Sequence, residues 1–454
     1  MNRTLWPAFL IATSGVIFAW YLLLNCDSAW HLAAAELLLE GRRFGIDLFE
    51  INTPLTTYFA IAPVWLAHVT GLSSIDWFFG LSALAIISCV GLSLAMLHRM
   101  DDRYIAFGLA YVLMFLPSLY ASYGQREHLM VALCTPYFVA CMLYLERLNY
   151  RHSATAALLA GIGFCIKPHF TLLFIAAEFS LIISTRSLAP LRRRELWIIL
   201  FVMSLYYFGL LLWEQGYVQS FLLLAPLYHA MYRPWDLHFL LPALIFSYVA
   251  LILRYRARSR PDALLWLCLC VAALIIYIVA RTGFNYQSFP LLAFTALAGA
   301  FILRVSRWRY GFILLHALLA YSVSATPSLL AERNTVLALS ETIRTYAKGE
   351  TAVILSNNNY MAFPAVVYSG ARWGASLPAL YYLDGYLRGQ RQENKKAESF
   401  FTSAIQADLA KKPKLIAINT RISSVDYALY FGLPKGYERK DNIAGYDIYV
   451  RQLP

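Results

Sequence analysis

The chain has 454 residues, of which 60% are hydrophobic and only 14% are charged. Soluble domains are typically about half apolar and a quarter charged, so this composition excludes a single soluble globule and indicates contact with a bilayer. The formal net charge of +12 is compatible with an anionic partner or with a membrane-topology signal, depending on where the cations lie.

Apolar runs of about 20 residues, the length that crosses a hydrocarbon core, recur as far as residue 326. No small-residue cleavage site follows the first run, which is therefore predicted to be a retained span. The fifth and sixth runs are short and meet at Lys167-Pro168, as two half-length helices or a broken pair would. The eleven predicted spans are 5–24, 75–97, 104–122, 129–145, 153–167, 168–185, 196–213, 239–253, 262–280, 288–303 and 310–326.

The loops between these runs alternate between many and few cations. One set of loops carries 16 Arg and no Lys, whereas the opposite set carries six cations. Because positively charged loops remain in the cytoplasm, we predict a cytoplasmic N-terminus and an extracytoplasmic location for everything after residue 326. The basic balance is therefore mainly an orientation signal, and we predict no nucleic-acid partner.

Residues 54–71 are also long enough to span, but a span there would break this alternation. We therefore predict a helix that lies in the outer interface, with Tyr58 and Trp65 at the level of the headgroups.

The composition changes near residue 330, after which 16 of the 38 cations and 11 of the 26 acids are found. The runs TAVILS and KLIAINT predict buried strands, AESFFTSAIQADLAKK an amphipathic helix and YERKDNIAGYDIYVRQ a closing hairpin. We predict a polytopic α-helical membrane module at 1–328, with a long first outer loop at 25–74. A small extracytoplasmic α/β domain is predicted at 329–454.

The first outer loop contains several acidic residues. Asp27 follows the first span and precedes a helix predicted from about Ser28 to Glu40, so it is compatible with a plain N-cap as well as with a functional acid. Asp47 and Glu50 follow on a turn.

This loop resembles the polytopic GT-C glycosyltransferases. It has an acidic residue just outside the first span, a helix ending in Gly41, an aromatic-to-Asp turn, and Pro-Leu before an aromatic-rich interfacial helix ending in Gly71. The nearest branch is that of the protein O-mannosyltransferases and bacterial lipid A aminoarabinose transferases. The resemblance covers residues 1 to about 100, and the run from Gly161 to Pro168 is similar to the family's Gly-rich span ending in Lys.

The resemblance implies an enzyme that moves a sugar from a polyprenyl-phosphate donor to an envelope glycan, lipid or protein, usually with inversion. It also implies a bacterial inner membrane and an active site on its outer side. Asp27 holds the position of the base that takes the acceptor proton. Asp47, Glu50 and His31 are candidates for orienting the acceptor or holding a divalent cation.

The leaving phosphate of such a donor requires cations. Four candidates lie beside predicted spans on the outer side, namely Arg126, Lys167, Arg233 and Arg281. For each of them an interfacial anchor is an equally good interpretation. The run SYGQREHL favours function, because four consecutive polar residues at a helix mouth exceed what anchoring needs.

Further candidates for the substrate pocket are Gln125, Glu127, His128, His169, Asn285 and Tyr286. Neither histidine has a second ligand at helical spacing, so no metal site is predicted. Glu178 lies within a predicted span and is expected to face the bundle interior or water.

Two other functions are compatible with the sequence. A lipid or glycan transporter or flippase would also be polytopic, although we find no internal repeat and the charges lie at the outer mouths. An inactive GT-C-like assembly partner in envelope polysaccharide synthesis is the third hypothesis. It is favoured by two departures from the family pattern, since the usual Asp-Glu pair is Asp27-Ser28 and the usual Pro-Pro is Thr53-Pro54.

Overall fold

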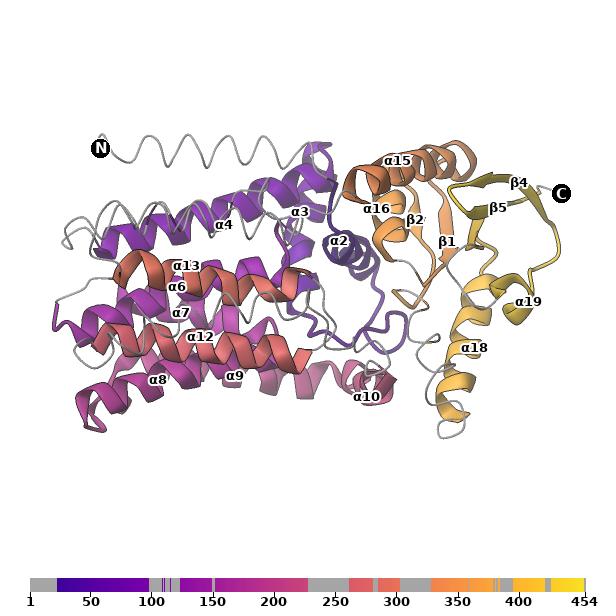
Figure 1. Cartoon of the computed structure of the whole chain (residues 1–454). Coiled ribbons are helices and arrows are strands. Elements are labelled where there is room, and N and C mark those ends of the chain that lie inside the picture. The colour runs from indigo at the N-terminus through magenta and orange to yellow at the C-terminus, as the bar shows by residue number, and fades with distance from the viewer. Residues whose placement is uncertain are drawn as a thin grey trace. The chain divides into compact units, whose positions relative to one another are not determined.

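A computed structural model describes most of the chain (Figure 1). The predicted spans at 5–24, 104–122, 239–253 and 310–326 lie outside the described residues, apart from a few positions. The described residues are 23–97, 108, 110, 115, 123–148, 152–227, 261–280, 285–302, 328–357, 359–378, 380, 383, 395–420 and 426–452.

The chain forms two compact units. Unit 1 comprises Met1–Leu22, Phe78–Phe208 and Arg233–Thr326. Unit 2 comprises Leu23–Trp77, Gly209–Tyr232 and Pro327–Pro454, so it combines the first outer loop with the C-terminal segment.

Five helices of the described chain are long and apolar enough to cross a membrane. They coincide with five of the predicted spans and, together with the composition, support an integral membrane protein. Two further predicted spans form the shorter helices α7 (Ser153–Cys165) and α13 (Phe289–Ile302). The five are α4 (Ser74–Leu97), α6 (Arg126–Leu145), η2 with α8 (Pro168–Thr185), α9 (Arg194–Trp213) and α12 (Pro261–Ala280).

Helices of unit 1 pack closely around α6. A Cβ atom at Gly163 of α7 would lie 2.6 Å from the Cys134 sulfur of α6, so the glycine allows the two helices to approach. By contrast, α9 exposes Trp197, Phe201 and Phe208. Because large apolar side chains in such a row face an apolar solvent, this side of α9 is suited to contact lipid.

The helical conformation is interrupted between α7 and α8 at Lys167. Its backbone is extended, with φ −144° and ψ 135°, as expected for a residue that precedes proline. The helix then restarts as the 3₁₀ turn η2 (Pro168–Phe170) and continues as α8 (Thr171–Thr185). The fifth and sixth predicted runs are therefore two separate helices, and only the second is long enough to span.

The helical part of unit 2 begins with α2 (Cys26–Leu39) and α3 (Leu55–Thr70), which pack together. Both helices were predicted, and each is followed by a glycine in the left-handed conformation. After α9 the chain continues into α10 (Gln215–Leu224). The hydroxyl of Tyr58 on α3 donates to Glu214, which holds α3 to the start of α10.

The C-terminal part of unit 2 contains a five-stranded sheet in the order β2-β1-β3-β5-β4. The first three strands are parallel, whereas β5 is antiparallel to β3 and β4. The predicted buried strands and closing hairpin are confirmed. The elements are α15 (Ser328–Ala347), β1 (Thr351–Leu355), α16 (Asn359–Ser369), β2 (Arg372–Trp373), α18 (Lys395–Ala410), β3 (Leu415–Asn419), α19 (Tyr427–Phe431), β4 (Tyr437–Ile443) and β5 (Tyr446–Arg451).

The loop after α2 touches the start of α10 through two glycines. Gly45 has φ +74°, and a Cβ atom on it would lie 1.9 Å from the carbonyl carbon of Gly216. Gly41 has φ +88° but open space around its Cβ position. Position 45 therefore requires glycine both for its backbone conformation and for the lack of space, whereas position 41 favours glycine for its conformation alone.

Gly45→Ala is expected to destabilise the protein more than Gly41→Ala does. Both variants carry the left-handed penalty of about 1–2 kcal/mol, but Gly45→Ala adds an overpacking cost of about 1–3 kcal/mol. Thermal unfolding of the two purified variants measures the difference. Equal melting temperatures would show that the loop does not depend on this backbone contact.

Candidate functional site

The first turn of α2 presents Asp27 on unit 2. The N-cap of the helix is Asn25, whose side-chain oxygen accepts from the backbone N–H of Asp27 at 2.9 Å. The N-cap interpretation of Asp27 is therefore wrong, because the asparagine two residues earlier already performs that task. Asp27 is half-buried and lies at the positive end of the helix dipole.

His31 lies one turn further along the same helix. It is buried, and its Nδ1 is 2.9 Å from the hydroxyl oxygen of Thr57 on α3. Residues four apart share a helix face, so Asp27 and His31 lie on the same side of α2. The contact fixes the imidazole relative to α3.

Glu50 is buried and accepts four hydrogen bonds. One oxygen accepts from Trp30 Nε1 at 2.6 Å. The other accepts from the backbone N–H groups of Ile51 and Asn52, both at 2.8 Å, and from Asn52 Nδ2 at 2.7 Å. This bonding ties the loop to α2 and keeps a buried carboxylate satisfied. The sequence did not single out Trp30, although a tryptophan needs a partner for its N–H when buried.

The C-terminal segment supports the other side of α2. The ring of Trp30 packs against Phe363 at 5.3 Å and Trp373 at 6.3 Å between centroids. The hydroxyl of Tyr368 accepts from the backbone N–H of Leu24 at 3.0 Å, and burial raises the pKa of Tyr368. The helix that presents Asp27 is therefore held by both halves of unit 2.

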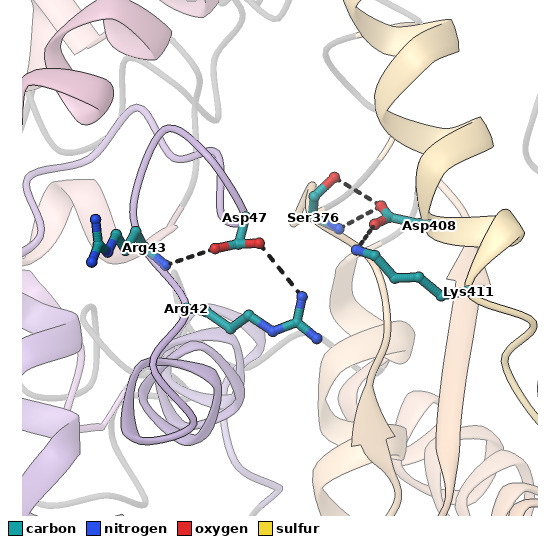
Figure 2. Close-up of polar contacts among 6 residues, drawn as sticks. All are labelled: Arg42, Arg43, Asp47, Ser376, Asp408 and Lys411. Carbon is teal, nitrogen blue, oxygen red and sulfur yellow. Dashed lines mark hydrogen bonds and ion pairs between the residues drawn. The ribbon is translucent and has the colours of Figure 1, made fainter.

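Asp47 lies beyond the other end of α2. Its carboxylate pairs with Arg42 at 3.5 Å and accepts from the backbone N–H of Arg43 at 3.1 Å (Figure 2). A helix of 14 residues is about 20 Å long. Asp27, His31 and, through Trp30, Glu50 thus lie near the start of α2, whereas Asp47 lies near its end.

On unit 1 the predicted polar run from Gln125 to His128 forms the start of α6, and all four side chains are buried. Glu127 pairs with the ammonium of Lys167 at 2.5 Å. Arg126 and Lys167 both act electrostatically on His169, so the structure brings these predicted residues together. The cluster thus contains the cations of Arg126 and Lys167 together with the carboxylate of Glu127.

Aromatic rings surround this cluster. The Lys167 ammonium lies 5.5 Å from the ring centroid of Tyr286, and His128 lies 3.9 Å from the ring of Phe289. Within the described part of the chain, no three His, Cys, Asp or Glu side chains are arranged as ligands of a metal ion. Arg233, Arg281 and the side chain of Asn285 lie outside the described residues.

A second buried ion pair on unit 1 joins Glu178 to Arg193. The Tyr137 hydroxyl donates to the same carboxylate oxygen. Glu178 faces the bundle interior, as predicted. Arg193 is one of the 16 loop arginines that indicate orientation, and its burial was not predicted because a charge count treats every loop arginine alike.

Comparison with known proteins identifies the fold. Neither a protein-family model nor a curated protein sequence matches this chain. The structure is similar to ArnT from Cupriavidus metallidurans in the apo state, with a TM-score of 0.56, 13% identity and 97% coverage of each chain. Against ArnT bound to undecaprenyl phosphate the TM-score is 0.57, with 12% identity and coverage of 99% of this chain and 98% of that one.

A mycobacterial arabinofuranosyltransferase, AftD, aligns with a TM-score of 0.48 and 12% identity over 40% of its length. That likeness is too weak to bear on the fold. ArnT is a member of the GT-C superfamily. The resemblance predicted from the first outer loop is therefore confirmed at the level of the fold.

Proposed function

We propose that this protein, which has the fold of GT-C glycosyltransferases, transfers a sugar from a polyprenyl-phosphate donor to a hydroxyl acceptor. The observation that carries the proposal is the position of Asp27. A half-exposed carboxylate occupies the first turn of a helix that is capped by Asn25 and clamped through Trp30 and Glu50. Such support keeps a catalytic group in place.

The proposed reaction is a single displacement. Asp27 accepts the proton of the acceptor hydroxyl while the acceptor oxygen forms a bond to the anomeric carbon. The bond between that carbon and the donor phosphate oxygen breaks on the opposite face, so polyprenyl phosphate leaves and the configuration inverts.

The donor phosphate is assigned to the buried cluster at the start of α6. Arg126 and Lys167 are 4% and 7% exposed, and the Lys167 ammonium pairs with the Glu127 carboxylate. A leaving phosphate gains negative charge, and cations in a water-poor site stabilise that charge more than in bulk water. The ArnT structure that contains undecaprenyl phosphate supports a donor of this class.

A transfer assay tests the function. The full-length protein in lipid nanodiscs is incubated with synthetic undecaprenyl-phosphate sugars and an envelope extract, and release of undecaprenyl phosphate is measured. A transferase releases the lipid phosphate only when acceptor is present, whereas a flippase moves the intact lipid. Absence of release with every sugar, together with movement of the intact lipid in liposomes, would establish the flippase instead.

A matched pair of variants in the same assay tests the donor site. Arg126→Gln is expected to weaken donor binding by roughly tenfold or more, because charge-assisted hydrogen bonds contribute about 1.5–3 kcal/mol. Arg147→Gln, which removes an exposed arginine beyond the other end of α6, is expected to bind donor normally. Equal donor affinity in the two variants would return Arg126 to the role of an interfacial anchor.

We also propose that the N-terminus is cytoplasmic and the C-terminal segment extracytoplasmic. All seven native cysteines are buried or half-buried, whereas Ser187 and Ser399 are exposed. An impermeant thiol reagent added to intact cells is expected to label Ser399→Cys and to spare Ser187→Cys. The opposite labelling pattern would reverse the orientation.

A further inference from the structure

Unit 2 contains a cavity of about 560 Å³. It lies between the end of α2 with its following loop, the segment around β2, and the turn that leads from α18 into β3. Cavities that hold small molecules have volumes of about 300–1,000 Å³. This cavity is thus large enough for a small ligand, and it lies at the end of α2 opposite to Asp27.

Charged side chains dominate the cavity wall. They include four carboxylates, from Glu40, Asp47, Glu350 and Asp408. Six basic side chains face these four carboxylates, so the wall has two more positive than negative groups. The basic side chains come from separate parts of the chain. These are Arg42, Arg372, Lys411, Lys412, Lys414 and Arg451.

Two arginines in the wall make long ion pairs, and Arg451 also donates to the carbonyl of Lys412 at 2.5 Å. Arg372 lies 3.5 Å from Glu40, and Arg451 lies 3.9 Å from Glu350. Exposed ion pairs of this kind contribute about 0–1 kcal/mol, so a ligand can replace either carboxylate at small cost.

Lysines supply the excess charge. Neither Lys412 nor Lys414 makes an ion pair with any carboxylate in the described part of the chain. Lys412 is exposed and Lys414 half-buried beside the cavity. The two therefore provide positive charge that no carboxylate among the described residues neutralises.

The frame of the cavity is fixed by Asp408, which is 1% exposed. Its carboxylate accepts from the backbone N–H of Ser376 at 2.6 Å, from the Ser376 hydroxyl at 2.7 Å and from Lys411 at 2.9 Å (Figure 2). The carbonyl of Ser376 in turn accepts from Phe49 N–H at 2.9 Å, and the Phe49 ring packs on Phe400 at 4.6 Å. The cavity is therefore formed before any ligand arrives, which reduces the entropy cost of binding.

We infer that this cavity binds a phosphate monoester. A phosphate monoester carries a charge of about −1.5 to −2 near neutral pH, which matches the excess of two positive charges. Arginine forks and lysine ammonium groups are the usual protein partners of phosphate oxygens. The cavity meets α2 at its C-terminal end, and Asp27 lies at the start of the same helix, which is about 20 Å long. The phosphate monoester is therefore a separate ligand, or a part of a substrate that lies away from the proposed transfer.

Isothermal titration of the full-length protein in nanodiscs of zwitterionic lipid tests this assignment. The titrants are inorganic phosphate, a hexose 6-phosphate and the uncharged hexose. Saturable binding of both phosphates, without binding of the hexose, is expected. Tighter binding of the hexose phosphate than of phosphate would assign a phosphorylated sugar, and equal binding would assign the phosphate group alone.

Two double variants distinguish the site from general surface charge. Lys412→Gln with Lys414→Gln is expected to weaken phosphate binding roughly tenfold or more. Lys435→Gln with Lys440→Gln removes the same charge from exposed positions outside the cavity and is expected to leave the affinity unchanged. Absence of saturable binding, or equal weakening in both double variants, would overturn the assignment.

Discussion

Asp27→Asn is expected to lower sugar transfer by roughly 10²–10⁴-fold, the usual contribution of general acid–base catalysis. The amide has nearly the same shape as the carboxylate but cannot take the acceptor proton. The Asn25 cap bonds to the backbone N–H of residue 27, so the substitution leaves the helix start intact. Release of undecaprenyl phosphate with acceptor present measures the effect.

Glu36→Gln is the matched control, since it makes the same change on the same helix. Glu36 lies 2.9 Å from His68 near the surface, where such a contact contributes little, and transfer is expected to remain near the wild-type rate. The Asp27→Asn variant should still bind the donor, and this result would show that the variant is folded and has lost only the transfer step. Turnover at the wild-type rate in Asp27→Asn would exclude Asp27 as the base.

Arg193→Met is expected to destabilise the protein by about 3–5 kcal/mol, because removing one partner leaves the other charge buried and unpaired. Glu178 is buried within α8, and its carboxylate receives hydrogen bonds from Arg193 and from Tyr137. The guanidinium also lies 5.1 Å from the ring of Tyr144. Methionine keeps much of the side-chain volume but supplies neither the charge nor the donors.

Thermal unfolding in detergent measures this loss, with two comparisons. Arg192→Met removes a neighbouring arginine that is exposed, and substitution of an exposed side chain usually changes stability by less than about 0.5 kcal/mol. Combining Arg193→Met with Glu178→Gln should recover most of the loss, because no unpaired charge remains. A single Arg193→Met variant as stable as Arg192→Met would show that the buried pair is dispensable.

Periodicity and composition were sufficient to predict the helices α2 and α3, the strands β1 and β3, and the hairpin of β4 and β5. Each depends on a pattern within a short stretch of chain, such as alternation or a glycine after a helix. The resemblance at the first outer loop also predicted the fold that comparison with ArnT confirms.

Sequence reasoning was less reliable where a residue's role depends on its neighbours in space. The local pattern was compatible with an N-cap at Asp27, and the hydrogen bond from Asp27 N–H to the Asn25 side chain identifies Asn25 as the cap instead. Arg193 counted as a cytoplasmic loop charge until the structure placed it against Glu178.

The sequence by itself determined that the protein lies in a membrane, where its apolar helices run and which loops carry the positive charge, since these properties follow from composition and spacing along the chain. The tertiary structure decided which charges meet. Arg42, Arg372 and Arg451 are hundreds of residues apart at the extremes, yet they line one cavity, because strand pairing and helix packing join segments whose separation in the sequence carries no record of their contact.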